Sequence, residues 1–117
     1  MISWRLGMSE KIDQYSVYWV DLNPTKGAEI NKTRPCVVIS PPEMNNHLRT
    51  VIIAPVTSRG REGYPTRLKF KVNTIEGWIV LDQIRAIDKL RLCEKIGNLN
   101  AKEVQILKGI IKEMLVD

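Results

Sequence analysis

Short segments rich in β-branched and aromatic residues, separated by brief polar turns, recur along most of this chain. They cover residues 16–22, 36–40, 50–57, 66–72 and 78–88, and the last of these holds two short runs. Segments of this length, in which apolar and polar side chains alternate, are typical of strands half-buried in a sheet. Up to six strands joined by short turns predict a mainly β fold, either a small antiparallel barrel or a tightly curled sheet.

Two of these segments give more detailed predictions. Residues 66–72 alternate strictly, with Leu68, Phe70 and Val72 on one face and three basic residues on the other, which we interpret as a solvated face. In residues 50–57, Pro55 lacks an N–H donor and predicts an edge, a bulge or a bend. We also expect a helical turn at residues 42–46 and a turn at residues 73–77.

The end of the chain predicts one amphipathic helix of about four turns. Asn100 precedes Glu103 by three residues, as in a capping box, and four apolar residues then recur at helical spacing. They are Val104, Leu107, Ile111 and Met114. Gly109 costs the helix about 1 kcal/mol relative to Ala, which indicates either close approach of another backbone or a tolerated exception.

The length of 117 residues is that of one domain with its own core. Residues 1–14 show no periodicity and predict a flexible N-terminal arm ahead of a domain over residues 15–117, and Met8 is as plausible a start as Met1. Lys and Arg exceed Asp and Glu by 18 to 13, so the net charge of +5 favours polyanionic partners.

Cysteine and histidine usage excludes several kinds of site. Cys36 and Cys93 are far apart and flanked by apolar residues, which indicates buried thiols in a reducing compartment. His47 is the single histidine, so paired-histidine catalysis and His–Cys zinc sites are excluded, and we expect no metal or other cofactor. No stretch has the length or apolarity of a signal peptide or a membrane span, so the expected location is the cytoplasm.

The loop between the first two predicted strands carries the most distinctive chemistry. It holds Lys26, Gly27, Glu29 and Lys32, and Arg34 closes it beside Pro35. Pro35 favours extended geometry at Arg34, so we expect the guanidinium at a strand edge, where its planar fork of donors suits phosphate. The alternative is an ordinary surface hairpin with a solvated arginine. A second loop, residues 58–65, has the glycine-rich, cationic composition of a mobile segment.

Several separated motifs together resemble the MazF/PemK toxin family. They are YWVDLNPTKGAE at residues 18–29, RPCVVISP at 34–41, NN at 45–46, PVT at 55–57, GYP at 63–65 and LDQIRAID at 81–88. The resemblance runs from about residue 15 to the C-terminal helix. It implies a sequence-specific, ribosome-independent endoribonuclease on a small SH3-like or CcdB-like barrel with a C-terminal helix.

The resemblance also implies roles for individual residues. Arg34 matches the family's catalytic arginine and Thr57 its catalytic threonine, while Glu29 is the best loop carboxylate for proton transfer. RNA cleavage without a metal is simplest when the ribose 2′-OH attacks the neighbouring phosphate, so charge neutralisation by Arg34 and donation by Thr57 fit that chemistry. The expected RNA-binding residues are Lys26, Gly27, Lys32, Ser58, Arg59, Arg61, Tyr64, Asp82, Gln83 and Arg85.

One departure indicates which branch of the family is more similar. PemK-like members carry an arginine two residues before Asp82 and a histidine near the start of the first loop, whereas this chain has Val80 and no histidine there. The chain therefore resembles the MazF branch, and an acid–base assignment copied from PemK is unsafe.

The resemblance implies a homodimer, single-stranded RNA as substrate and a cognate MazE-like antitoxin with an acidic, disordered tail. Two alternatives stay open. A CcdB-like inhibitor of DNA gyrase uses the same barrel without cutting, and a non-catalytic RNA-binding module needs only the positive charge.

Overall fold

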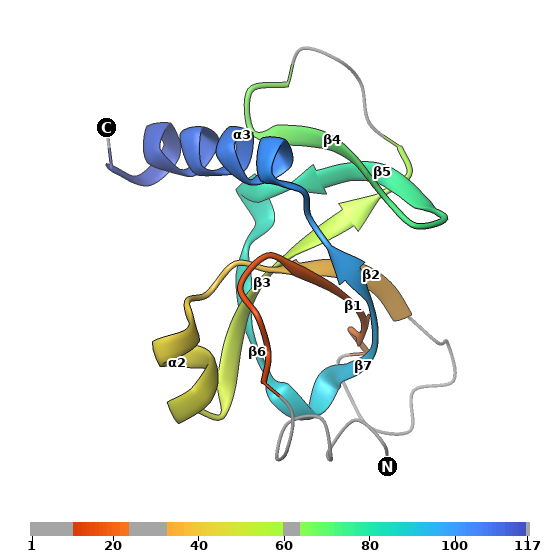
Figure 1. Ribbon diagram of the computed structural model, residues 1–117, viewed down its shortest axis with the longest axis vertical. Helices are drawn as coiled ribbons and strands as arrows, with labels where there is room; N and C mark the ends of the chain where they lie inside the picture. Colours follow the sequence, from red (N-terminus) through yellow and green to blue (C-terminus); the bar gives the residue numbers. More distant parts are fainter. Residues whose placement is uncertain (1–10, 24–32, 60–63, 117) are drawn as a thin grey trace.

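The computed structural model describes residues 11–23, 33–59 and 64–116, and its strands are followed by a C-terminal helix as expected (Figure 1). The strands are β1 (Ser16–Asp21), β2 (Thr33–Val38), β3 (Thr50–Thr57), β4 (Arg67–Val72), β5 (Ile75–Val80), β6 (Arg85–Asp88) and β7 (Leu92–Asn98). The helices are α2 (Pro42–His47) and α3 (Ala101–Ile111), with 3-10 turns η1 (Leu81–Gln83) and η2 (Lys89–Arg91) and a π-helical turn η3 (Lys112–Val116).

Every strand pair among the described residues is antiparallel. The sheet runs in the order β4-β5-β3-β2-β1-β7, and β6 pairs with β3 off this path. Figure 1 shows β7, β1, β2, β3 and β6 curling around a common interior, while β4 and β5 extend away under α3. The predicted fold class, a small antiparallel barrel with a C-terminal helix, is confirmed.

Strand β3 joins the two parts of the sheet and bends at Pro55. Ile53 lies between β2 and β6, where it pairs with Val38 and Arg85. Pro55 faces Cys36 in the last recorded pair with β2, and the strand then pairs with β5 through Val56 and Thr57. Of the three readings of Pro55, the bend is correct and the edge is wrong, because β3 is central in the sheet.

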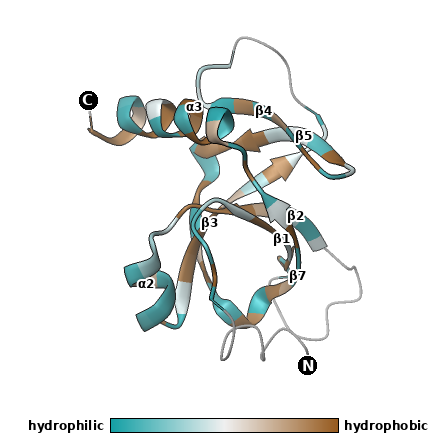
Figure 2. Ribbon diagram, viewed as in Figure 1, coloured by the Kyte–Doolittle hydropathy of each residue, from teal (hydrophilic) through white to brown (hydrophobic). Residues whose placement is uncertain are grey.

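Both faces of the central strands are buried, in two separate hydrophobic clusters. Consecutive residues alternate between them, so that Val17 and Val37 enter one cluster while Tyr18 and Val38 enter the other. The first cluster lies under α3 and contains Leu107, and the second fills the curled part of the sheet (Figure 2). This double burial explains why β1 and β2 are apolar at adjacent positions.

Helix α3 has the predicted capping box and amphipathic pattern. The Asn100 side chain accepts from the Glu103 N–H at 2.7 Å, and the Glu103 carboxylate accepts from the Asn100 N–H at 2.9 Å. Leu107 is fully buried, and the other three predicted positions pack against the same cluster. Over residues 11–23, 33–59 and 64–116, no helix combines the length and apolar character needed to span a membrane.

The strands differ from the prediction in three ways. β2 begins at Thr33, before Arg34, because pairing with β1 extends to Asp21. β5 begins at Ile75, because the hairpin turns at Asn73, whose φ of 55° is the left-handed conformation that allows a tight turn. Strand β7 was not predicted, since register shifts against β1 interrupt its alternation.

The boundary of the predicted N-terminal arm is also corrected. Ile12 is 3% exposed in the second cluster, and its carbonyl accepts from the Asn45 side-chain amide at 3.0 Å. The Gln14 side chain donates to the Ile39 carbonyl at 2.9 Å. Residues 11–14 therefore belong to the folded domain, and residues 1–10 lie outside the described residues.

Two single-residue predictions are decided by the structure. Gly109 is the tolerated exception, because a Cβ there would meet no atom of the described residues within 4 Å. Cys93 is only partly buried, although Cys36 is fully buried as expected, and both thiols are free.

Candidate active site

Arg34 and Thr57 face each other where the β2–β3 ladder ends. The last pair is Cys36 with Pro55, and two residues further in the same register stand Arg34 on β2 and Thr57 on β3. There β3 has turned to pair with β5, with Thr57 opposite Trp78. Because β3 and β2 separate beyond this pair, an opening lies between them, and the Arg34 and Thr57 side chains line it.

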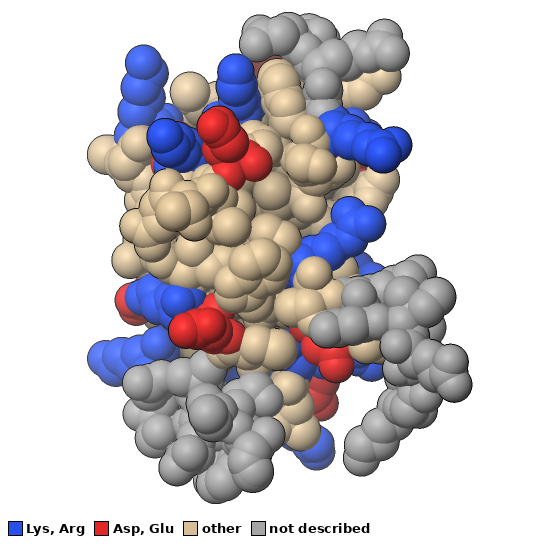
Figure 3. Space-filling model, turned by 90° about the vertical axis from the view of Figure 1, so that its right-hand side faces the viewer, with Lys and Arg blue, Asp and Glu red and all other residues tan. Residues whose placement is uncertain are grey.

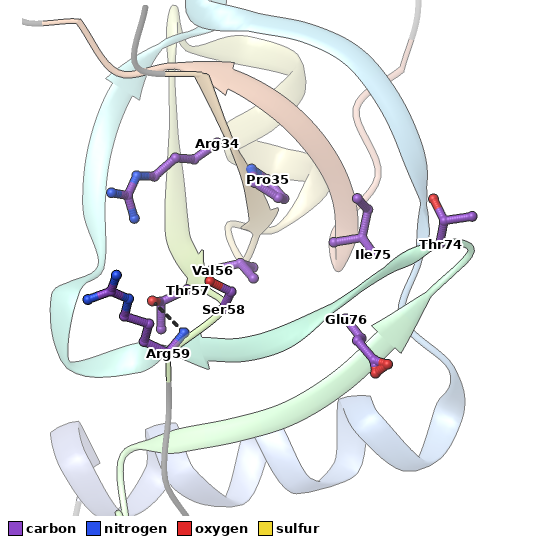
Figure 4. Close-up of a pocket in the computed structure, with 9 residues that line it drawn as sticks. All are labelled: Arg34, Pro35, Val56, Thr57, Ser58, Arg59, Thr74, Ile75 and Glu76. Carbon is purple, nitrogen blue, oxygen red and sulfur yellow. Dashed lines mark hydrogen bonds between the residues drawn. The ribbon is translucent and has the colours of Figure 1, made fainter.

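A cavity of about 630 Å³ occupies this opening. Its lining residues are Arg34, Pro35, Val56, Thr57, Ser58, Arg59, Thr74, Ile75 and Glu76. Figure 4 shows the guanidinium groups of Arg34 and Arg59 extending toward the same end, where the Thr57 hydroxyl also lies, while Thr74 and Ile75 line the opposite end. The cationic groups and the hydroxyl are therefore gathered at one end of the cavity.

A second cavity of about 220 Å³ shares Arg34, Val56, Thr57 and Arg59 with the first. Its remaining lining residues are Pro55, Arg67, Val80 and Gln83. Arg34 and Thr57 thus lie on the wall common to both cavities. A bound strand that fills both would pass these two side chains.

The Thr57 hydroxyl is oriented by the backbone that follows it. Its Oγ1 accepts a hydrogen bond from the Arg59 N–H at 3.1 Å. Because that contact uses an acceptor position, the hydroxyl proton stays available for donation. Thr57 is half-buried and Arg34 is exposed, so both groups are reachable from solvent.

Gly77 on β5 fixes the backbone of Thr57 from behind. A Cβ at Gly77 would lie 2.5 Å from the Thr57 carbonyl oxygen, closer than real Cβ atoms come to backbone. Gly77 was assigned to a turn from the sequence, but it lies within β5. The glycine is required by the close approach of β3 and not by a turn.

The buried Cys36 thiol lies two residues from Arg34 but is not a nucleophile. Burial raises its pKa to about 12, against the lowering effect of Arg85 and Arg34. The group therefore stays a protonated thiol at neutral pH, and its part is packing.

Arg67 is a site residue that the sequence analysis missed. It was assigned to a solvated strand face together with Lys69 and Lys71, which are exposed. Arg67 instead lines the smaller cavity, and its Nε lies 3.6 Å from Asp82. Its position beside the Gly-Tyr-Pro segment was the only sequence signal available.

The structure brings together some of the predicted RNA-binding residues. Ser58 and Arg59 line the larger cavity and Gln83 the smaller one, while Asp82 and Tyr64 contact Arg67 at its margin. Arg85 lies on β6 and lines neither cavity. Predictions for Lys26, Gly27, Glu29, Lys32 and Arg61 fall outside the described residues.

On the face drawn in Figure 3, the charged side chains are dispersed and do not form one patch. Figure 3 shows a largely uncharged middle, with Lys and Arg around its margins, on the side that faces right in Figure 1. The cations that converge are those lining the cavities. Among the described residues, no three His, Cys, Asp or Glu side chains are grouped as a metal site would need.

Comparison with known proteins identifies the family. The profile of the PemK-like, MazF-like toxins of type II toxin-antitoxin systems matches residues 13–115. This chain belongs to that family. The chain is similar to the endoribonuclease MazF of Staphylococcus saprophyticus, with 36% identity over 81% of this chain and 83% of that protein.

Two further similarities support the PemK/MazF assignment. The endoribonuclease toxin MazF of Escherichia coli K12 is 32% identical over 88% of this chain and 93% of its own length. The crystal structure of MazE-MazF from Deinococcus radiodurans superimposes with a TM-score of 0.73 at 25% identity, covering 90% of this chain and 96% of that one. The resemblance inferred from the sequence motifs is thereby confirmed.

Proposed function

We propose that this MazF-type endoribonuclease toxin cuts single-stranded RNA at specific sequences, without a metal ion and without the ribosome. Its action on mRNA would take place in the cytoplasm. The observation that carries the proposal is the convergence of Arg34 and Thr57 on the wall shared by the two cavities. Family membership supports the reaction class, and the two side chains supply chemistry suited to a phosphodiester.

In the proposed reaction the ribose 2′-oxygen attacks the adjacent phosphorus, and the bond from phosphorus to the 5′-oxygen breaks. The products are a 2′,3′-cyclic phosphate and a 5′-hydroxyl end. Arg34 would neutralise charge that grows on the non-bridging oxygens, because a guanidinium is permanently charged and presents paired donors. Thr57 would donate a hydrogen bond from its hydroxyl to the same phosphoryl group.

Two protons must also move, one from the 2′-hydroxyl and one to the 5′-oxygen. We assign Glu29 as the carboxylate for one transfer, on the basis of its place in the first loop. The residue that ends β1 before this loop is held in place, because the Asp21 carbonyl accepts a hydrogen bond from Arg91 Nη1 at 3.0 Å.

The cations of the cavities also support the proposed antitoxin partner. Arg34 and Arg59 line both cavities, which suits either successive RNA phosphates or an acidic peptide. An acidic, disordered tail of a MazE-like antitoxin would compete with RNA for this groove. Neutralisation would then be competitive and would weaken as salt is raised.

We propose a homodimer as the assembled form of the toxin. Leu115 and Val116 at the end of η3 are 62% and 73% exposed, and Ile106 in the middle of α3 is 43% exposed. Large apolar side chains left exposed are a feature of surfaces that associate. Light scattering at micromolar concentration tests this, and a monomer would contradict it.

The decisive experiment compares the wild type with Arg34→Ala on a long unstructured RNA in the presence of a chelator. The wild type is expected to cut at defined sites and leave cyclic or 3′-phosphate ends. Arg34→Ala should cut at least about 100-fold more slowly, because it loses a charged donor to the transition state. Since Arg34 is exposed, the variant should keep its melting temperature.

The matched control is Arg34→Lys, which keeps the charge but loses the planar fork. It is expected to fall between the wild type and Arg34→Ala. Wild-type protein that shifts RNA mobility without cutting would favour the RNA-binding module. Absence of both effects, with inhibition of DNA gyrase, would favour the CcdB-like alternative.

A further inference from the structure

Arg67 is a cation in the smaller cavity that the proposed chemistry does not use. It opens β4 beside the end of β5, where it pairs in register with Val80. Its guanidinium carbon lies 4.9 Å from the centroid of the Tyr64 ring, and its Nε lies 3.6 Å from Asp82 Oδ1. Thr66 holds the carboxylate in turn, because its hydroxyl donates to the same oxygen at 2.9 Å.

These contacts fix the side chain and offset its charge. An aromatic face and a carboxylate together restrict the guanidinium to one orientation, with its side chain 22% exposed. Because Asp82 offsets the charge, the pair attracts a phosphate less than a lone arginine would. What it still offers is directional N–H donation.

The Nε atom has unused donor capacity. It is buried and has no hydrogen-bond partner among the described residues, since its contact with Asp82 is longer than a hydrogen bond. A ligand in the cavity would accept from the terminal nitrogens of this arginine and not from Nε, because Nε itself is buried. Asp82 and Tyr64 leave the guanidinium held in place for such a ligand.

The rest of the cavity suits a group with several polar edges, because its lining is mainly polar. Pro55, Val56 and Val80 contribute only a small apolar part, since Val56 and Val80 are buried, and Gln83 brings a side-chain amide. The volume of about 220 Å³ is about a third of that of the neighbouring cavity. Arg34 and Thr57 form the boundary between the two, so a group bound here lies beside the phosphate that they hold.

We propose that the smaller cavity binds the base of a nucleotide next to the scissile phosphate, and that Arg67 selects guanine at that position. Guanine presents two adjacent acceptors, O6 and N7, which match the paired donors of a guanidinium. An unpaired base in single-stranded RNA exposes this edge. Arg67 is thus a specificity-determining residue, and this inference rests on the proposed ribonuclease function.

The test is the sequence logo of cut sites on an unstructured RNA pool with randomised positions. The wild type should require guanine at one fixed distance from the cut. Arg67→Ala and Arg67→Gln should each lower that preference by roughly tenfold, while preferences at the other positions stay unchanged. Lys69→Ala is the matched control, because Lys69 is a basic residue on the same strand that lines neither cavity.

Each other outcome is decisive. If the wild type does not cut RNA, the proposed function fails. Wild-type cutting without a guanine preference overturns the inference alone. An unchanged logo for Arg67→Ala, or equal slowing at every sequence, does the same, because the second result indicates a phosphate contact or a structural role. Should Arg67→Ala unfold by circular dichroism, Arg67→Lys keeps the charge without the fork and is expected to relax the same position.

Discussion

The two ends of β3 show how one strand serves both the core and the active site. At Ile53 the strand is paired on both sides, with β2 and β6, and the side chain is fully buried. At Thr57 it is paired with β5 alone, and the side chain is half-buried beside a cavity. The three residues between these positions include the bend at Pro55.

The opening arises because β3 loses its ladder with β2. Where three strands run together, the alternating side chains fill the two clusters. Where β3 leaves β2 for β5, the facing positions hold no buried pair, and polar groups on rigid strands line the gap. Such groups are positioned more firmly than loop residues would be.

The largest effect is expected at the open end. Thr57→Val keeps the β-branched shape but removes the hydroxyl, so RNA cleavage should fall by about 100- to 1,000-fold. Stability should change little, because the Arg59 N–H that loses its acceptor is exposed. Single-turnover cleavage and thermal unfolding measure the two quantities. Thr57→Ser, which restores the hydroxyl, should recover most activity, and equal loss in both variants would contradict a role for the oxygen.

Substitution at Ile53, where β3 is paired on both sides, should lower stability and leave cleavage nearly unchanged. Ile53→Ala removes a fully buried side chain and should lower the free energy of unfolding by about 3 kcal/mol. Cleavage per folded molecule should stay close to the wild type. Denaturant titration gives the stability, and Ile53→Val, expected to cost about 1 kcal/mol, is the graded control. A large loss of activity in the folded fraction would show that the two ends are not independent.

Gly77→Ala tests the contact that joins stability to activity. The new Cβ must displace the Thr57 carbonyl, so unfolding free energy should fall by about 1–3 kcal/mol and cleavage should fall as well. Gly97→Ala is the matched control on β7. A Cβ there lies 2.6 Å from a Val72 methyl group, away from either cavity, so it should cost stability alone. Full activity in Gly77→Ala would show that RNA cleavage does not depend on the position of the Thr57 backbone.

The smallest effect concerns pH and Cys36, where the pairing of β2 with β3 begins. Burial raises the pKa of this thiol from 9.0 to about 12, so above pH 9 the unfolded chain loses a proton that the folded chain keeps. Stability should therefore fall as pH rises from 9 toward 12, by at most about 1.4 kcal/mol per pH unit from this group. Urea titrations at pH 8 to 10 should show a steeper slope for the wild type than for Cys36→Ala. Burial also raises the pKa of Cys93 and Tyr15, but these groups are common to both proteins. Equal slopes in the two proteins would mean that the Cys36 thiol does not cause the fall in stability with rising pH.

Much of the fold follows from local patterns. The alternation of Leu68, Phe70 and Val72 and the capping box at Asn100 were predicted because each depends on neighbouring residues alone. Strand β7 was missed because its bulges are imposed by β1. Gly77 was misassigned because the sequence does not show which backbone passes behind it.

Residue type, spacing and motif were enough to predict most of the strands, the C-terminal helix, the family and Arg34 with Thr57 as paired candidates. The tertiary structure decided that β3 changes partners at Pro55, that Arg34 and Thr57 line a shared wall, and that Arg67 leaves the solvated face for a cavity. The physical reason is that strand pairing joins residues far apart in the chain, and the point where a ladder ends depends on every strand that competes for it.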